Sequence, residues 1–93
     1  MIVAVAFEFL PGGFERIKEE IIDVIEITQK EDGVQIYGWA LDVTAPNRAI
    51  IFEVWDDQEA LDAHFTQPYM DTLVAGLGSA NIRRDIKCYS AEI

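Results

Sequence analysis

Residues 52–65 read Phe-Glu-Val-Trp-Asp-Asp-Gln-Glu-Ala-Leu-Asp-Ala-His-Phe, and this stretch decides the fold. Its first four residues combine aromatic and β-branched side chains, which is typical of a strand. Asp56, with Glu59 three positions later, has the spacing of a capping box and predicts a helix over 57–65. One strand and the helix after it therefore bring a glutamate, a tryptophan and the only histidine of the chain close together in sequence.

The rest of the sequence predicts an α+β arrangement around this stretch. Short segments rich in β-branched and aromatic residues predict four strands, at 2–10, 34–43, 48–56 and 81–91. The turn residues at 44–47 join the second and third strands into an antiparallel hairpin.

Two further helices complete the prediction. Apolar residues at helical spacing, together with Thr28, predict a helix over 14–31 that Gly33 closes at its C-terminal end. Pro68 suits the first turn of another helix. The stripe predicted for that helix consists of Met70, Leu73, Val74 and Leu77.

The resulting order, β-α-β-β-α(α)-β, is that of the ferredoxin-like fold, with a four-stranded antiparallel sheet. The 93 residues suit one domain, so we interpret residues 1–93 as a single domain.

Both faces of the predicted sheet are apolar, although its helices can cover only one. In the first strand Val3 and Phe7 alternate with Ala4 and Ala6, and in the third strand Phe52 alternates with Ile51 and Glu53. An antiparallel sheet with one solvated face should instead alternate apolar and polar residues. We therefore expect a homodimer in which two sheets pack face to face.

Composition excludes several classes of partner. A net charge of −10, from 7 Lys+Arg against 17 Asp+Glu, disfavours nucleic acid and anionic membrane surfaces. No apolar stretch is long enough to span a bilayer. The single cysteine, Cys88, and the single histidine give no zinc-ligand spacing and no internal disulfide. We expect a cytoplasmic protein with no metal or other cofactor.

The strand ending Phe-Glu-Val-Trp, followed by Asp-Asp-x-Glu-Ala-Leu-x-Ala-His-Phe and Gln-Pro-Tyr, resembles the antibiotic biosynthesis monooxygenase family. The similarity covers most of the chain and includes the break at Pro11-Gly12-Gly13 and Tyr37. It implies a dimeric α+β barrel and, as one activity of the family, cofactor-independent oxygenation of quinols and anthrones. Haem-degrading relatives need an asparagine on the first strand and a histidine in the segment after Pro68. This chain has neither, which argues against haem chemistry.

His64 has two interpretations. It follows Leu61 by three residues and Ala60 by four, so it shares an apolar helix face and should point toward the sheet. It is either a catalytic residue, as proton acceptor or hydrogen-bond donor to a phenolic substrate, or a structural residue that bonds a backbone carbonyl.

Glu53 is a carboxylate in an apolar strand, so it must be paired or have a raised pKa. It is either a substrate-binding acid–base group or an ion-pair partner, across the dimer or with an arginine. The candidate arginines are Arg48, Arg83 and Arg84. Glu53 shares a strand face with Trp55, and the sequence leaves open whether that face meets the helices or the dimer interface.

The remaining candidate residues are aromatic or basic. Trp55, Tyr37, Trp39 and Tyr69 either form a flat aromatic pocket or fill the core. Arg83 and Arg84 either bind an anionic group of a substrate or form ion pairs. Cys88 is expected to be a buried thiol.

Two functions follow from these observations and the resemblance. The first is oxygenation of a small planar quinol or anthrone, with His64 as the catalytic residue. Its substrate-binding residues would be Trp55, Tyr37, Tyr69 and Glu53. The alternative is a non-enzymatic dimeric binding or interaction module whose interior is filled by its own side chains.

Overall fold

Four strands and three helices make up the part of the chain that the structure describes. This computed structural model describes the backbone of residues 1–79 and 82–91, and the side chains of residues 1–77 and 91. The elements are β1 (Ile2–Phe9), α1 (Gly13–Thr28), β2 (Val34–Asp42), β3 (Ala45–Trp55), α2 (Gln58–Phe65), α3 (Pro68–Ser79) and β4 (Ile82–Ala91). The strands pair antiparallel in the order β2-β3-β1-β4. The predicted ferredoxin-like fold with an antiparallel sheet is confirmed.

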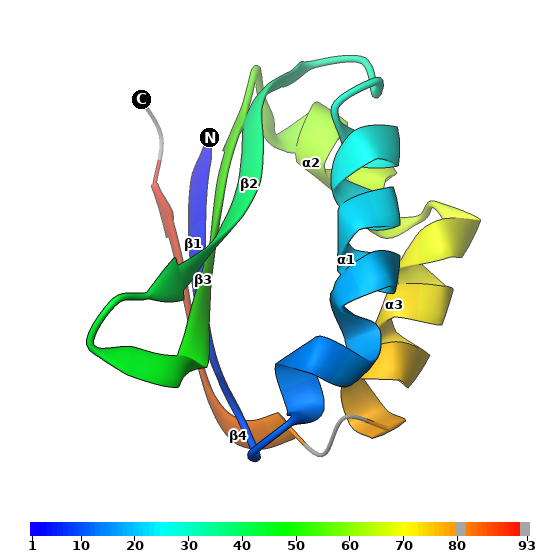
Figure 1. Cartoon of the computed structure of the whole chain (residues 1–93). Coiled ribbons are helices and arrows are strands. Elements are labelled where there is room, and N and C mark those ends of the chain that lie inside the picture. The colour runs from blue at the N-terminus through cyan, green and yellow to red at the C-terminus, as the bar shows by residue number, and fades with distance from the viewer. Residues whose placement is uncertain (80–81, 92–93) are drawn as a thin grey trace.

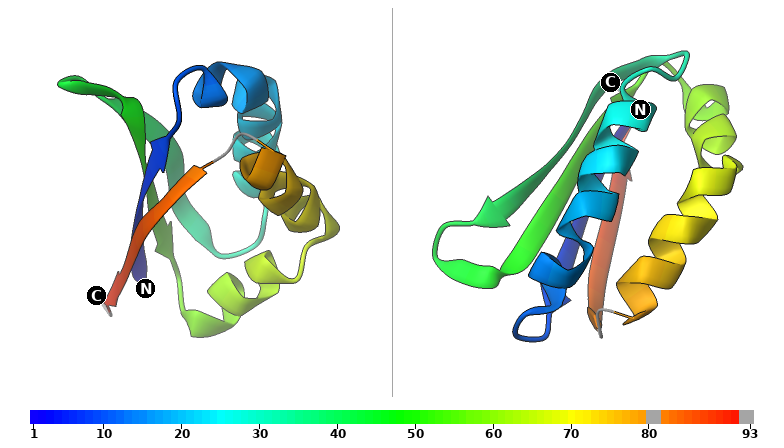
Figure 2. Two further views of the ribbon diagram at one scale, coloured as in Figure 1. Left: turned by 90° about the horizontal axis from the view of Figure 1, so that it is seen from below. Right: turned by 45° about the vertical axis from the view of Figure 1, so that its right-hand side comes forward.

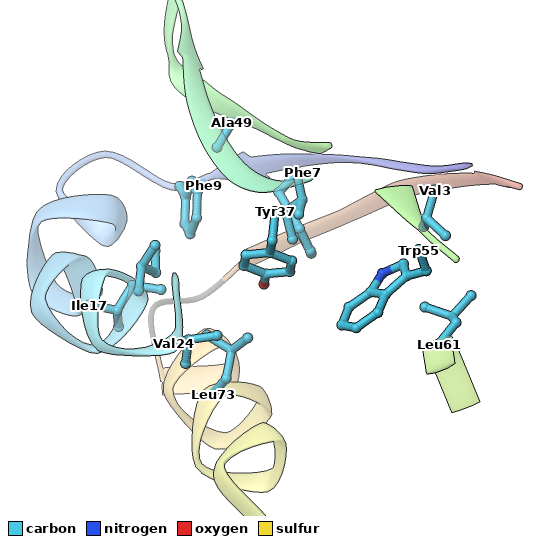
Figure 3. Packing of buried hydrophobic residues seen from close by; sticks show 12 residues of the cluster. Val3, Phe7, Phe9, Ile17, Val24, Tyr37, Ala49, Trp55, Leu61 and Leu73 are labelled. Carbon is cyan, nitrogen blue, oxygen red and sulfur yellow. The ribbon is translucent and has the colours of Figure 1, made fainter. Parts of the chain in front are cut away.

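The described helices α1, α2 and α3 all lie on one face of the sheet (Figures 1 and 2). Odd-numbered residues of β1 and β3 point toward them, because side chains alternate along a strand. Between the two layers lies the hydrophobic core, to which α1 contributes Ile17, Ile21 and Val24. Tyr37 and Trp55 point from the sheet into this layer (Figure 3). The site described below is built in the same layer.

The opposite side of the sheet, which we call the open face, is apolar and carries none of the described helices. Among the described side chains of β1, β2 and β3, this face includes Ile2, Ala4, Ala6, Ile36, Gly38, Ala40, Ile50 and Phe52. Ile36 is 51% exposed, and Ile50 and Phe52 are each 43% exposed. Phe52 pairs with Ala4 on one side and Gly38 on the other, so the largest of these described residues is flanked by small ones. A contiguous exposed apolar surface of this kind is typical of an interaction site.

The hairpin between β2 and β3 turns earlier than predicted. Its turn is Val43-Thr44, not 44–47, and β3 already begins at Ala45. Asp42 fixes this turn, because its Oδ1 accepts hydrogen bonds from the backbone N–H and the hydroxyl of Thr44, both at 2.8 Å. Pro46 lies where the register between β2 and β3 shifts. Such an irregular place tolerates a residue without an N–H.

Two helix boundaries also differ from prediction. α1 ends at Thr28, not at residue 31, because the chain tightens into bonds from Lys30 N–H to Ile27 O and from Glu31 N–H to Thr28 O. The N-cap of α2 is Asp57, whose Oδ1 accepts from the Ala60 N–H at 2.9 Å. Asp56, the predicted cap, instead accepts a hydrogen bond from Gln35.

α3 begins at Pro68, as predicted, but its apolar stripe is narrower than expected. Leu73 is 3% exposed and belongs to the core, with Met70 and Leu77 packed against it. Val74 is 63% exposed, so its predicted place on the buried stripe is wrong. The helix turns this position toward solvent, and Tyr69 packs against the core instead.

We expect Gly33→Ala to destabilise the protein by about 2 kcal/mol or more. Gly33 has φ +83°, and an added Cβ would lie 2.6 Å from the Cβ of Ala60 on α2. Gly12→Ala is the matched control, because Gly12 has φ +80° but an added Cβ meets nothing within 4 Å. Urea unfolding of both variants separates backbone strain from the contact with Ala60. Equal losses of stability in the two variants would show that this contact contributes nothing.

Candidate functional site

His64 lies at the centre of a polar cluster between α2 and the sheet. It is 1% exposed, and its ring centroid is 4.8 Å from that of Trp55 and 5.6 Å from that of Tyr37. The strand face that carries Glu53 and Trp55 meets the helices and not the open face, since these residues are 4% and 0% exposed. The question that the sequence left open is settled in favour of the helices. Glu53, Trp55 and His64 therefore meet.

Glu31 lies in the loop between α1 and β2 and contacts side chains on two helices, α2 and α3. Its Oε2 lies 2.6 Å from Nδ1 of His64 on α2, and it also accepts a hydrogen bond from the hydroxyl of Tyr69 on α3. The Tyr69 hydroxyl lies 3.1 Å from Oγ1 of Thr28, at the end of α1, and 3.2 Å from Nδ1 of His64. The structural role predicted for His64, a bond to a backbone carbonyl, is replaced by this bond to a carboxylate.

Glu53 lies on the other side of the imidazole. Its Oε1 accepts a hydrogen bond from Nε1 of Trp55 at 3.0 Å and lies 3.9 Å from Nε2 of His64. Burial raises the pKa of the Glu53 carboxyl, and the bond from Trp55 and the proximity of His64 oppose this shift.

The predicted ion pairs of Glu53 are corrected in part. Pairing across a dimer through the sheet face is wrong, because strand alternation directs Glu53 toward the helices. Arg48 is exposed. The side chains of Arg83, Arg84 and Cys88 lie outside the described ones.

Aromatic rings surround this cluster on the sheet side. The hydroxyl of Tyr37 accepts a hydrogen bond from Nε1 of Trp39 at 3.1 Å, and Trp39 stacks on Phe7 with ring centroids 5.4 Å apart. Burial raises the pKa of Tyr37 to about 12. Burial and then the hydrogen bond to Glu31 raise the pKa of Tyr69. Both phenols therefore stay protonated at neutral pH and act as neutral hydrogen-bonding groups.

Sequence reasoning missed two members of the cluster, Glu31 and Thr28. Thr28 carried a signal in the sequence, because it is a polar residue on the apolar stripe predicted for α1. In the structure it is 0% exposed. Glu31 carried none, because it was assigned to the end of the predicted helix and its position depends on where that helix stops. All buried nitrogen and oxygen atoms of the described side chains have hydrogen-bond partners.

We expect Glu53→Gln to alter how stability depends on pH. The pKa of Glu53 is raised in the folded protein, so the folded state holds this proton more tightly than the unfolded chain. Wild-type stability should fall as pH rises from the unfolded pKa, about 4.3, toward the folded pKa. The variant should lack this part of the fall, and its amide oxygen can still accept from Trp55. Urea unfolding across this pH range is the measurement, with the exposed Glu59→Gln as control. Parallel stability curves for wild type and Glu53→Gln would contradict the expectation.

Comparison with known proteins places this site in a family. The sequence profile described as antibiotic biosynthesis monooxygenase matches residues 1–76. The chain belongs to the antibiotic biosynthesis monooxygenase family. The matched residues include β1, β3, α2 and every side chain of the His64 cluster named above. None of the described helices is long and apolar enough to cross a membrane.

Solved structures share the fold of this family member. A candidate antibiotic biosynthesis monooxygenase from Deinococcus radiodurans is 21% identical, with a TM-score of 0.86, and the match covers 100% of this chain and 94% of that one. Rv0793 from Mycobacterium tuberculosis is 22% identical, with a TM-score of 0.86 and coverage of 99% and 93%. At this level of identity the likeness shows the fold alone.

A curated relative is closer in sequence over a shorter region. An uncharacterised protein of Synechocystis sp., sll1783, is 39% identical over 61 residues. The match covers 61% of this chain and 42% of the relative, so it spans less than half of that protein.

Proposed function

We propose that this chain is a cofactor-independent monooxygenase that acts on a small planar aromatic substrate of the quinol or anthrone type. The observation that carries the proposal is the buried imidazole of His64, which lies between two carboxylates and among the rings of Trp55 and Tyr37. Membership of the family supports the reaction class. The site residues of the proposal are His64 for proton transfer and Trp55, Tyr37, Tyr69 and Glu53 for binding.

The proposed reaction needs only the substrate, dioxygen and a base. His64 removes a proton from the acidic CH₂ group of an anthrone, and the carbanion reduces dioxygen and forms a carbon–oxygen bond to it. The resulting peroxide anion takes up one proton and loses water, which leaves a carbonyl group, so that CH₂ and O₂ become C=O and H₂O. The imidazolium form of His64 is stabilised by Glu31 and Glu53 and returns its proton as water leaves. The aromatic side chains orient the ring and exclude water.

The proposal includes a homodimer in which the open faces of two chains pack against each other. The exposed Ile36, Ile50 and Phe52 support it, because a single chain leaves these side chains in water. Family membership supports the same assembly. In this arrangement the His64 cluster lies on the helix side of each sheet, away from the interface.

A non-enzymatic binding or interaction module is the second candidate. It is favoured by the near-complete burial of His64, at 1% exposed, and by the partners found for all buried polar atoms of the described side chains. A substrate that approaches His64 must therefore displace a neighbouring side chain. Two such neighbours are the half-buried Tyr69 and the exposed Phe65. Their ring centroids lie 6.1 Å and 5.5 Å from that of the imidazole.

Oxygen uptake distinguishes the two candidates. Purified protein, stripped of metal by a chelator and free of flavin absorbance, is mixed with a panel of quinols and anthrones, and dioxygen is followed with an electrode. The enzyme hypothesis predicts protein-dependent uptake with at least one substrate, and mass spectrometry should detect its carbonyl product. Uptake no faster than the uncatalysed rate across the panel would favour the module.

A further inference from the structure

We propose that Glu31 is the positioning residue of the site, and that its Oε2 holds the proton of neutral His64 on Nδ1 and so makes Nε2 the proton acceptor. This inference rests on the proposed function for its catalytic consequence. The arrangement of protons that it predicts can be measured without any substrate.

The hydrogen bonds around Glu31 fix the direction of each donor. The Tyr69 hydroxyl donates its only proton to Oε2 of Glu31, so the oxygen of Tyr69 can act only as an acceptor toward its other neighbours. Thr28 must then be the donor in its 3.1 Å bond with Tyr69. Nδ1 of His64 has two contacts, at 2.6 Å to the Glu31 carboxylate and at 3.2 Å to the Tyr69 oxygen, and both are acceptors. Both contacts therefore require a proton on Nδ1.

A proton on Nδ1 leaves the lone pair of the neutral imidazole on Nε2. Nε2 lies 3.9 Å from Oε1 of Glu53, which is beyond hydrogen-bond distance, and the Trp55 N–H is already bonded to that oxygen. The groups that titrate near the ring are Glu31 from the loop, Glu53 from β3, Tyr37 from β2 and Tyr69 from α3. Because the lone pair is on Nε2, the reacting side of the imidazole is the side that faces Glu53 and Trp55.

The loop that carries Glu31 is held against α2 by its backbone. The carbonyl of Gly33 accepts a hydrogen bond from the Asp56 N–H at 2.7 Å. The absence of a side chain at Gly33 lets the loop approach Ala60, one helical turn before His64. Glu31 is thus placed by backbone contacts that do not involve His64, as a positioning group requires.

The test uses the fact that the chain has one histidine, so the nitrogen NMR spectrum contains a single imidazole. Long-range proton–nitrogen correlation of labelled protein, recorded over a series of pH values, identifies which nitrogen carries the proton when the ring is neutral. In the wild type, Nδ1 should be the protonated nitrogen and Nε2 the unprotonated one. Glu31→Met has similar length but no strong acceptor, and it frees Tyr69 to donate to Nδ1. It should therefore move the proton to Nε2.

Glu31→Gln is the matched control, because its amide oxygen can still accept from Nδ1 and Tyr69. It should keep the proton on Nδ1, which separates the acceptor role of residue 31 from its charge. With an active substrate, kcat should fall roughly 10²-fold in Glu31→Met, because Nε2 no longer accepts a proton, and should fall less in Glu31→Gln. Circular dichroism of both variants checks that each remains folded.

Three results would overturn the inference: a wild-type proton on Nε2, a ring that stays doubly protonated at every accessible pH, or a folded Glu31→Met with the proton still on Nδ1. Failure of the proposed function is recognised separately. A wild-type protein with the expected arrangement of protons but no oxygen uptake would refute the monooxygenase and leave the role of Glu31 in place.

Discussion

Replacing His64 by alanine is expected to lower the rate of oxygen uptake with an active substrate by about 10²-fold or more. The imidazole is the group that would remove the substrate proton, and the neighbouring carboxylates stabilise its charged form. Loss of the ring also leaves Glu31 without one of its two donors. The measurement is the initial rate of uptake under saturating substrate.

Two controls separate chemistry from folding in this experiment. Asp62→Ala alters an exposed residue of the same helix and should leave the rate unchanged, since Asp62 bonds only Gln58 among the hydrogen bonds described. Added imidazole should partly restore the rate of His64→Ala, because the substitution leaves a space of that shape beside Glu31. Unchanged turnover in His64→Ala would remove this residue from the mechanism.

Replacing Phe52 by aspartate is expected to convert a dimer into a monomer at micromolar concentration. Phe52 is the largest of the described side chains of the open face and is 43% exposed in the single chain. A two-fold interface contains the substitution twice, so two carboxylates would be buried without partners. Each buried charge without a partner costs several kcal/mol, and every 1.4 kcal/mol weakens association about tenfold.

Light scattering after size exclusion measures this effect. The wild type should have twice the chain mass of 10.5 kDa, and Phe52→Asp should have the mass of one chain. Val43→Asp is the matched control, because Val43 is 98% exposed in the turn between β2 and β3 and is not part of the open face. A monomeric wild type, or a Phe52→Asp variant that remains dimeric, would refute the proposed assembly.

The sequence predicted the fold because its patterns are local. Strand alternation and helical spacing report which side of an element is buried, and both are visible in single segments such as α1 and β3. The meeting of Glu53, Trp55 and His64 was likewise accessible, because a strand and the adjoining helix carry all three.

The parts that sequence patterns could not predict depend on backbone geometry between elements. Asp56 and Asp57 are identical residues side by side, and only the path of the chain decides which one caps α2. Glu31 meets His64 across 33 positions of sequence, because α1 ends in a tightened turn and Gly33 lets the loop approach α2. No spacing rule connects residues so placed.

The alternation of β3 also determines which changes of chain length relatives can accept. Glu53 and Trp55 point toward the helices, whereas Ile50 and Phe52 point the other way. Inserting or deleting one residue within 50–55 would turn every later side chain of the strand to the opposite face of the sheet. Phe52 or Val54 would then lie where Glu53 and Trp55 now lie. An insertion at Val43-Thr44 would lengthen only the turn, so we expect relatives to differ in length there and to keep β3 free of gaps.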